Sequence, residues 1–243
     1  MSEYEGYAPF FHSFNPPRSI VPRPATLGLD IGSTSVSAVV VELSTGKNLF
    51  ADSVVHRASL PPDVAGANVQ DPRRLLGIAR QLSKTALEAF PAIQAIGVTG
   101  QMHGIIPIDR QGAPTGPAYT WLDSRAEGLK EQMKEDIGQT VPAGYGAATL
   151  YALIRSGSLK TGSYSVASIP AWVAGQLGRS TSVATSEGLA QSLGFFSMET
   201  RSFDEESWSR IGPISPPPVG ADATFVGETE TGTPVCLPEG DNQ

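Results

Sequence analysis

The fold that this sequence predicts is decided by the stretch Thr26-Leu27-Gly28-Leu29-Asp30-Ile31-Gly32-Ser33-Thr34-Ser35. Its first four residues are typical of a short buried strand, and the residues from Asp30 onward are typical of a turn. The Val-rich residues 36–43 and then residues 49–57 predict two more strands, with the turn signal Thr45-Gly46-Lys47 between them. Three consecutive strands with tight links predict an antiparallel meander.

A helix and a further strand follow the meander. Asp71 is placed to cap the helix and Pro72 suits its first turn, while Pro91 ends it. Residues 95–99 then form a compact apolar strand. Because a helix between two strands makes a crossover, we expect this strand to have a parallel partner. The sequence therefore predicts an α/β fold.

The other elements have weaker patterns. Residues 1–25 show no period and are predicted to be a flexible leader. The rest of the chain predicts strands at 105–108, 165–169 and 234–237, helices at 124–136, 147–156 and 204–210, a short helix after Pro170, and a loop-rich stretch at 212–234.

Composition excludes several classes of function. The 243 residues include 17 Lys and Arg against 24 Asp and Glu, and this excess of acid argues against nucleic-acid binding. The aliphatic runs are far shorter than the ~20 apolar residues of a membrane span, so no membrane partner is expected. Cys236 is the only cysteine, which fits a reducing compartment and predicts a cytoplasmic location.

The turn after the first strand is a candidate phosphate site. Gly32 allows a ligand to approach the backbone amides, and Ser33, Thr34 and Ser35 add hydroxyl donors. Asp30, at the strand end, is placed to hold Mg²⁺ through water. The alternative is an ordinary hairpin turn that is rich in turn-forming residues.

Polar side chains also follow the strand at 95–99. Gln101 and His103 can hydrogen-bond hydroxyl groups, and Met102 can pack against a carbon skeleton, so the mixture suits a sugar or another polyol. In open α/β sheets ligands collect at the carboxyl ends of strands. The alternative is a turn histidine with satisfied hydrogen bonds beside a core methionine.

Two more stretches carry candidate site residues. Trp121 and Asp123 can shape a carbohydrate pocket, although Asp123 or Ser124 can equally cap a helix with Trp121 as its anchor. Asp241 can act as a general base that takes a proton from an attacking hydroxyl. The alternative for Asp241 is a solvated residue near a frayed end.

Together these stretches resemble one family. Four segments, 27–35, 97–104, 121–125 and 240–243, occur in the order found in FGGY carbohydrate kinases. The stretches 23–30, 144–149 and 193–196 are most similar to members that phosphorylate sedoheptulose, and Gln101-Met102-His103-Gly104 resembles the ketose-kinase branch. The resemblance implies an actin- or hexokinase-type, ribonuclease-H-like N-terminal domain over residues 26–243, with a mixed five-stranded sheet and flanking helices. The family's C-terminal ATP-binding domain is then absent.

The resemblance also implies a reaction in which MgATP phosphorylates a ketose. The ketose that it favours is sedoheptulose, which would be converted to sedoheptulose 7-phosphate. It implies Asp241 as the catalytic base, and Gly32 to Ser35 around the transferred phosphate. It further implies Asp30 near the metal, with sugar contacts from Gln101, Met102, His103, Trp121, Asp123 and Asp241.

Two departures from the family pattern support a second hypothesis. Ser37 stands where the family usually has Lys or Arg, and the chain ends at Gln243 without the second domain. We therefore expect an N-terminal half that is impaired alone, with an uncovered interdomain face that allows self-association. The alternative is a non-catalytic sugar-binding or regulatory fragment.

Overall fold

A computed structural model describes residues 23–160, 162–181, 183–220 and 224–241. The predicted leader, residues 1–25, lies almost entirely outside them. The predicted meander is confirmed as three antiparallel strands, β1 (Ala25–Ile31), β2 (Ser35–Glu42) and β3 (Asn48–Val55). Burial alternates along β1 and β2, as expected for strands that pack one face against a core.

The crossover is also confirmed. Helix α1 (Pro72–Ala89) begins after Asp71, whose carboxylate accepts a hydrogen bond from the Arg73 amide at 2.9 Å, and it ends two residues before Pro91. Strand β5 (Ile93–Gly100) follows and runs parallel to β1. The helix therefore returns the chain to the starting edge of β1.

The main sheet is seven-stranded, in the order β11-β12-β5-β1-β2-β3, with β13 also paired to β5. Strands β12 (Pro234–Cys236) and β13 (Glu239–Gly240) both pair with β5 in parallel, at Ile96 and then at Thr99 and Gly100. β12 and β13 lie one after the other along β5 and together take the place of one strand. With β5, β1, β2 and β3 they make the mixed five-stranded sheet that was predicted. Beyond it lies β11 (Phe225–Glu228), in a region predicted to be loop-rich. The sequence did not predict this strand, because four residues that include Gly227 have too weak a pattern.

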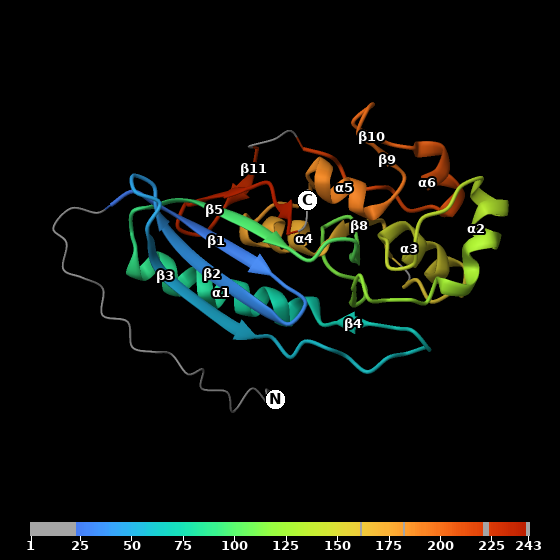
Figure 1. Ribbon diagram of the computed structural model, residues 1–243, viewed down its shortest axis with the longest axis horizontal. Helices are drawn as coiled ribbons and strands as arrows, with labels where there is room; N and C mark the ends of the chain where they lie inside the picture. The colour runs from blue at the N-terminus through green and yellow to red at the C-terminus, as the bar shows by residue number, and fades with distance from the viewer. Residues whose placement is uncertain (1–22, 161, 182, 221–223, 242–243) are drawn as a thin grey trace.

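A second sheet of short strands continues from the first, in the order β4-β7-β6-β8. Its strands are β4 (Val69–Gln70), β7 (Ala118–Tyr119), β6 (Ile105–Ile108) and β8 (Ser165–Ser168). A hairpin of β9 (Phe196–Ser197) and β10 (Ser202–Phe203) lies near the far end of the molecule (Figure 1).

The other helices follow later in the chain, and α2, α3 and α6 lie at the end opposite the main sheet (Figure 1). They are α2 (Lys130–Ile137), α3 (Gly146–Arg155), α4 (Ile169–Leu177), α5 (Glu187–Leu193) and α6 (Glu205–Ile211). The helix predicted at 124–136 starts later than expected. A 3₁₀ turn, Glu127–Leu129, precedes α2, because the Glu127 amide donates to Ser124 O and the Leu129 amide to Ala126 O, both at 2.9 Å and both three residues back instead of four.

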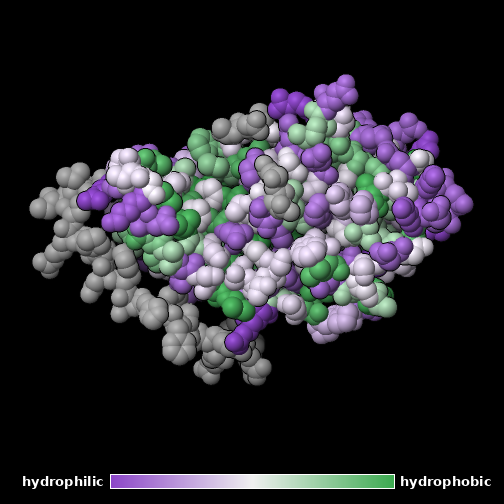
Figure 2. Space-filling model, viewed as in Figure 1, coloured by the Kyte–Doolittle hydropathy of each residue, from purple (hydrophilic) through white to green (hydrophobic). Residues whose placement is uncertain are grey.

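One face of the main sheet packs against α1 and α4. Leu27, Leu29 and Ile31 of β1 are fully buried there with Leu75 of α1 and Trp172 of α4. The opposite face is hollowed by about 690 Å³, and Gly28 and Gly97 lie side by side on its floor. Figure 2 shows hydrophilic residues gathered at the end formed by α2 and α6. Within the described residues, no helix is long and apolar enough to span a membrane.

The burial of Leu29 predicts a large effect of its truncation. Leu29→Ala should lower the free energy of unfolding by about 2–5 kcal/mol, because it leaves a cavity between the sheet and α1. Leu43→Ala is the matched control, since Leu43 is 53% exposed and should change stability by less than about 0.5 kcal/mol. Urea unfolding measures both, and equal losses would contradict this assignment of the core.

Candidate active site

Three segments that are distant in sequence meet at one edge of the main sheet. Ile31 at the end of β1 and Gly240 at the end of β13 both pair with Gly100 at the end of β5. Gln101 N–H donates to Ile31 O at 3.0 Å, and Asp241 N–H donates to Gly100 O at 3.2 Å. The structure therefore brings together the predicted site residues Asp30, Gln101 and Asp241.

Glycine is required at the centre of this meeting point. A Cβ atom added to Gly100 would lie 2.4 Å from Ile31 O, which no side chain can tolerate. At Gly240, a Cβ would lie 2.5 Å from Met102 Sδ. Met102 therefore packs directly against the backbone that carries Asp241. Gly100 therefore lets the ends of β1 and β5 approach closely, whereas a Cβ at position 240 would require the Met102 side chain to move.

The carboxylates of Asp30 and Asp241 influence one another. The pKa of Asp30 is raised above its ordinary value, mainly by burial and then by the negative charge of Asp241. Its Oδ1 atom is buried and has no hydrogen-bond partner within the described residues. A bound cation would offset the unfavourable charge on Asp30 and would give its Oδ1 atom a partner. Oxygen ligands of this kind fit Mg²⁺, which also keeps several waters. No group of three or more His, Cys, Asp or Glu side chains gathers within the described part of the chain.

The turn between β1 and β2 lies beside Asp30. Gly32 N–H donates to Ser35 O at 3.0 Å and closes the turn. Ser33 Oγ accepts a hydrogen bond from Trp121 Nε1 at 3.0 Å, so its own hydroxyl hydrogen is available to a ligand. Thr34 is exposed at the tip. The predicted phosphate-binding residues therefore form one open turn, and Trp121 is placed against it.

His103 is held in one orientation. Its φ of 66° is left-handed, its N–H donates to Ser192 Oγ at 3.2 Å, and its Nδ1 lies 2.9 Å from Ser192 O. Because a carbonyl oxygen can only accept, Nδ1 carries the hydrogen and Nε2 is left as an acceptor in the neutral ring. The ring also packs on Tyr145, with centroids 4.3 Å apart. Nε2 is thus suited to accept a hydrogen bond from a hydroxyl group.

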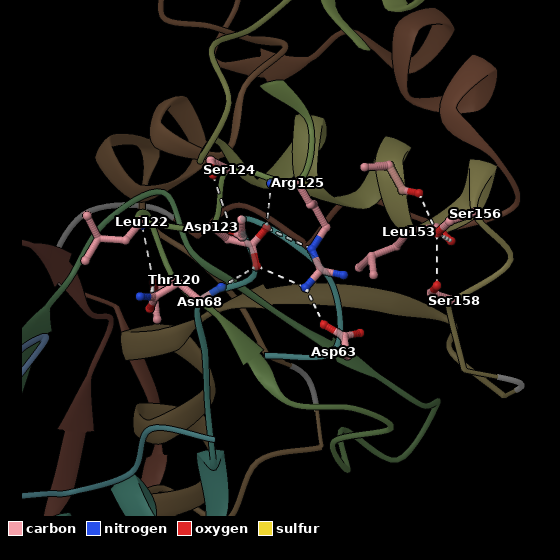
Figure 3. A network of polar contacts seen from close by, with 12 residues as sticks. Asp63, Asn68, Thr120, Leu122, Asp123, Ser124, Arg125, Leu153, Ser156 and Ser158 are labelled. Atoms are coloured by element: carbon pink, nitrogen blue, oxygen red, sulfur yellow. Dashed lines mark hydrogen bonds and ion pairs between the residues drawn. The ribbon is translucent and has the colours of Figure 1, made fainter. Parts of the chain in front are cut away.

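Gln101 and Asp123 are engaged inside the protein. The Gln101 side chain is 2% exposed, and its Nε2 donates to Gln70 Oε1 at 3.1 Å and to Gly32 O at 3.4 Å. Asp123 is fully buried, and its oxygens accept hydrogen bonds from Asn68 N and from Arg125 Nε and Nη2, at 2.8–3.0 Å (Figure 3). These contacts favour positioning roles. Direct sugar contact by either residue stays a prediction.

Sequence reasoning missed several residues of the site. His56 and Gln70 contact the turn through Ser33 O, and Ser192 and Tyr145 hold His103. These contacts join residues that are 23, 37 and 89 positions apart for His56, Gln70 and Ser192. No local motif marks them, so a single sequence carried no signal for them.

Comparison with known proteins identifies the family. The model of the FGGY family of carbohydrate kinases, N-terminal domain, matches residues 25–146, which is half of the chain. The chain therefore belongs to the FGGY family of carbohydrate kinases. This match covers the meander, the crossover, and the stretches that carry Asp30, His103 and Asp123.

Curated relatives include sedoheptulokinase of Mus musculus, which is 30% identical over 220 residues, covering 78% of this chain and 45% of that protein. Xylulose kinase of Streptomyces rubiginosus is 26% identical over 209 residues, covering 78% of this chain and 40% of that protein. The chain thus spans less than half the length of these two relatives.

Solved structures confirm the fold. The ligand-bound xylulose kinase from Lactobacillus acidophilus superposes with a TM-score of 0.76 at 17% identity, covering 90% of this chain and 48% of that one. The xylulose kinase from Rhodospirillum rubrum gives 0.73 at 21% identity, covering 89% and 49%. The predicted sugar-kinase architecture of the actin and hexokinase type is confirmed.

The buried ion pair at Asp123 predicts a stability effect. Asp123→Asn should lower the free energy of unfolding by about 3 kcal/mol, because the buried Arg125 then keeps only the more exposed Asp63 carboxylate, at 3.3 Å, as a charged partner. Glu88→Gln is the control, since it removes an ion pair with Lys84 in which both side chains are mostly exposed. Urea unfolding compares the variants. A loss at Asp123 as small as that at Glu88 would rule out the structural role.

The raised pKa of Asp30 predicts that replacing this residue with asparagine increases stability in a pH-dependent way. In the unfolded chain the carboxyl loses its proton near 3.8, so the folded state is penalised as pH rises from there through the raised pKa. Asp30→Asn should therefore be more stable than the parent at pH 7, and the gain should vanish below about pH 4. Thermal melting at several pH values measures it, with Asp109→Asn as control. A difference in melting temperature between Asp30→Asn and the parent that does not change with pH, or that has the opposite sign, would show that the pKa of Asp30 is not raised.

Proposed function

We propose that the chain is the sugar-binding half of an ATP-dependent ketose kinase, with sedoheptulose as substrate. One arrangement supports the proposal: an open hydroxyl-rich turn, an acceptor histidine and a carboxylate directly follow the aligned ends of β1, β5 and β13. The similarity to sedoheptulokinase from mouse, and at 26% identity from human, supports the choice of sugar. Xylulose is the next candidate, because xylulose kinases are also among the relatives.

The proposed reaction is phosphoryl transfer to the terminal hydroxyl of the sugar. Asp241 takes the proton of that hydroxyl, and the oxygen bonds to the γ-phosphorus as the bond from phosphorus to the ADP oxygen breaks. The turn at Gly32 to Ser35 holds the transferred group with its amides and hydroxyls. His103 Nε2 accepts from a sugar hydroxyl, and Met102 supports the carbon chain. Positioning supplies most of the rate in such reactions.

Magnesium fits the proposal. Asp30 would hold the ion through water, and the charge of the ion would neutralise the phosphate oxygens. The orphaned Asp30 Oδ1 is the observation that supports this assignment. The pKa of Asp30 would fall beside a cation, so its carboxylate would then be fully ionised.

The proposal assigns slow turnover to the chain alone. Its curated relatives are about twice as long, so the full set of ATP contacts is not expected within it. Self-association through an uncovered interdomain face and a cytoplasmic location also stay predictions. Each is compatible with the family, and neither is needed for the proposed chemistry.

A second function is favoured by one residue. Ser37 replaces the cation that the family usually has near the phosphates, and its hydroxyl instead bonds Ser53 Oγ at 2.9 Å. A sugar-binding fragment without phosphoryl transfer would need no cation at that position. The two functions differ in whether nucleotide binds at all.

Calorimetric titrations of the 243-residue chain with sedoheptulose and with MgATP separate these functions. The kinase proposal expects both to bind, and a coupled assay should then show slow ADP release. Sugar binding without nucleotide binding would favour the fragment, whereas the absence of sugar binding would overturn both.

Asp241→Asn is the matched variant. It should keep His103, Met102 and most of the sugar affinity, while ADP release falls by about 10²- to 10⁴-fold, as expected for loss of a general base. Rapid turnover by the unmodified chain would contradict its impairment. An Asp241→Asn variant that turns over as fast as the parent would contradict the role of the base.

A further inference from the structure

Every carbonyl oxygen along the turn after β1 accepts a hydrogen bond from the protein. Ile31 O accepts from Gln101 N–H, Gly32 O from Gln101 Nε2, and Ser35 O from Gly32 N–H. Thr34 O accepts from His56 N–H at 3.1 Å. Ser33 O accepts two bonds, from His56 Nε2 at 2.9 Å and Gln70 Nε2 at 3.0 Å, which fill both of its lone pairs. The carbonyl side of the turn is therefore fully occupied.

Within the described residues, the amides on the other side of the same turn have no hydrogen-bond partner. Ser33 and Thr34 lie between β1 and β2, and neither N–H donates in any backbone hydrogen bond found among the described residues. In a trans peptide the N–H and C=O point in opposite directions. Fixing the oxygens of Gly32 and Ser33 therefore turns the amides of Ser33 and Thr34 outward, away from the side chains that hold them. Two adjacent outward amides form an anion-binding concavity.

The three side chains that hold the turn are buried and come from separate strand ends. His56 follows β3, Gln70 ends β4 and Gln101 follows β5, and they are 2%, 4% and 2% exposed. Buried polar side chains are costly unless their hydrogen bonds are made. Each of the three makes at least one with the turn, whereas Gln101 Oε1 has no partner within the described residues. Reversing the Gln101 amide would set its oxygen against the oxygens of Gly32 and Gln70, so the observed orientation is the one that the network allows.

The tautomer of His56 is fixed by the same network. Its Nδ1 accepts a hydrogen bond from Ala58 N–H at 2.9 Å, so Nδ1 carries no hydrogen and Nε2–H is the donor to Ser33 O. Burial lowers the pKa of His56, and the nearby charge of Arg74 lowers it as well. The ring is thus held neutral, as its role as donor and acceptor requires.

We propose that His56, Gln70 and Gln101 form a carbonyl clamp that fixes the turn at Gly32–Thr34 with its amides directed outward for a phosphoryl group. The three are positioning residues, since they act through the turn. The identity of the anion as the transferred phosphoryl group rests on the proposed function; the clamp itself does not.

Gln70→Met tests the clamp, because it removes the donor to Ser33 O without adding charge. In ¹H–¹⁵N NMR spectra of the full chain, titration with inorganic phosphate should shift the Ser33 and Thr34 amides. In Gln70→Met their apparent affinity should fall about tenfold, the effect of one lost hydrogen bond. Gln81→Glu, on the exposed side of α1, is the control and should behave as the parent.

The outcomes distinguish the clamp from the kinase proposal. The clamp is overturned if the Ser33 and Thr34 amide signals of the parent do not shift with phosphate. It is also overturned if a folded Gln70→Met variant binds phosphate as tightly as the parent. If phosphate binding and its loss in Gln70→Met follow the expectation but the chain binds no sugar, the clamp is supported and the kinase function is overturned. Should Gln70→Met not fold, the ¹⁵N spectrum of the parent's His56 decides: the Nε2–H tautomer at pH 7.5 supports the clamp, and the Nδ1–H tautomer overturns it.

Discussion

The parallel pairing of β1 and β13 with the central strand β5 is the constraint on which the site depends. It aligns Ile31, Gly100 and Gly240, and so places the residues that follow them at one edge of the sheet. Backbone hydrogen bonds from Gln101 and Asp241 extend the alignment one residue past the strands. Because successive strand residues face opposite sides, a shift by a single residue would move every side chain of the site away from its partners.

The site is built at a cost in stability that the core offsets. Beneath the sheet, residues such as Leu27 and Leu29 bury apolar surface against α1 and α4. At its edge, Asp30 is partly buried beside another carboxylate, and one of its oxygens has no partner within the described residues. Groups held unfavourably in the free protein are those that a charged ligand can stabilise. This is the usual exchange of stability for function at active sites.

The sequence predicted the elements whose pattern is local. The short apolar stretch at 26–29 and the Val-rich residues 36–43 predicted β1 and β2, while Asp71, Pro72 and Pro91 marked the ends of α1. It also predicted that Asp30, Gln101 and Asp241 share a site, through the order of their motifs. It did not predict β11, whose four residues include Gly227, nor the late start of α2, which a 3₁₀ turn precedes. His56 and Gln70 were missed for a related reason: their contacts to Ser33 depend on the folded sheet and leave no mark on neighbouring residues.

The most direct test of this account is the titration of the Asp30 carboxyl carbon by NMR, in the parent and in Asp241→Asn. Burial is the larger cause of the raised pKa, and the charge of Asp241 is the second. The account therefore predicts that the pKa of Asp30 falls in Asp241→Asn but stays above its ordinary value, while Asp109→Asn leaves it unchanged. An Asp30 pKa that is the same in the parent and in Asp241→Asn would mean that the two carboxylates do not share a site.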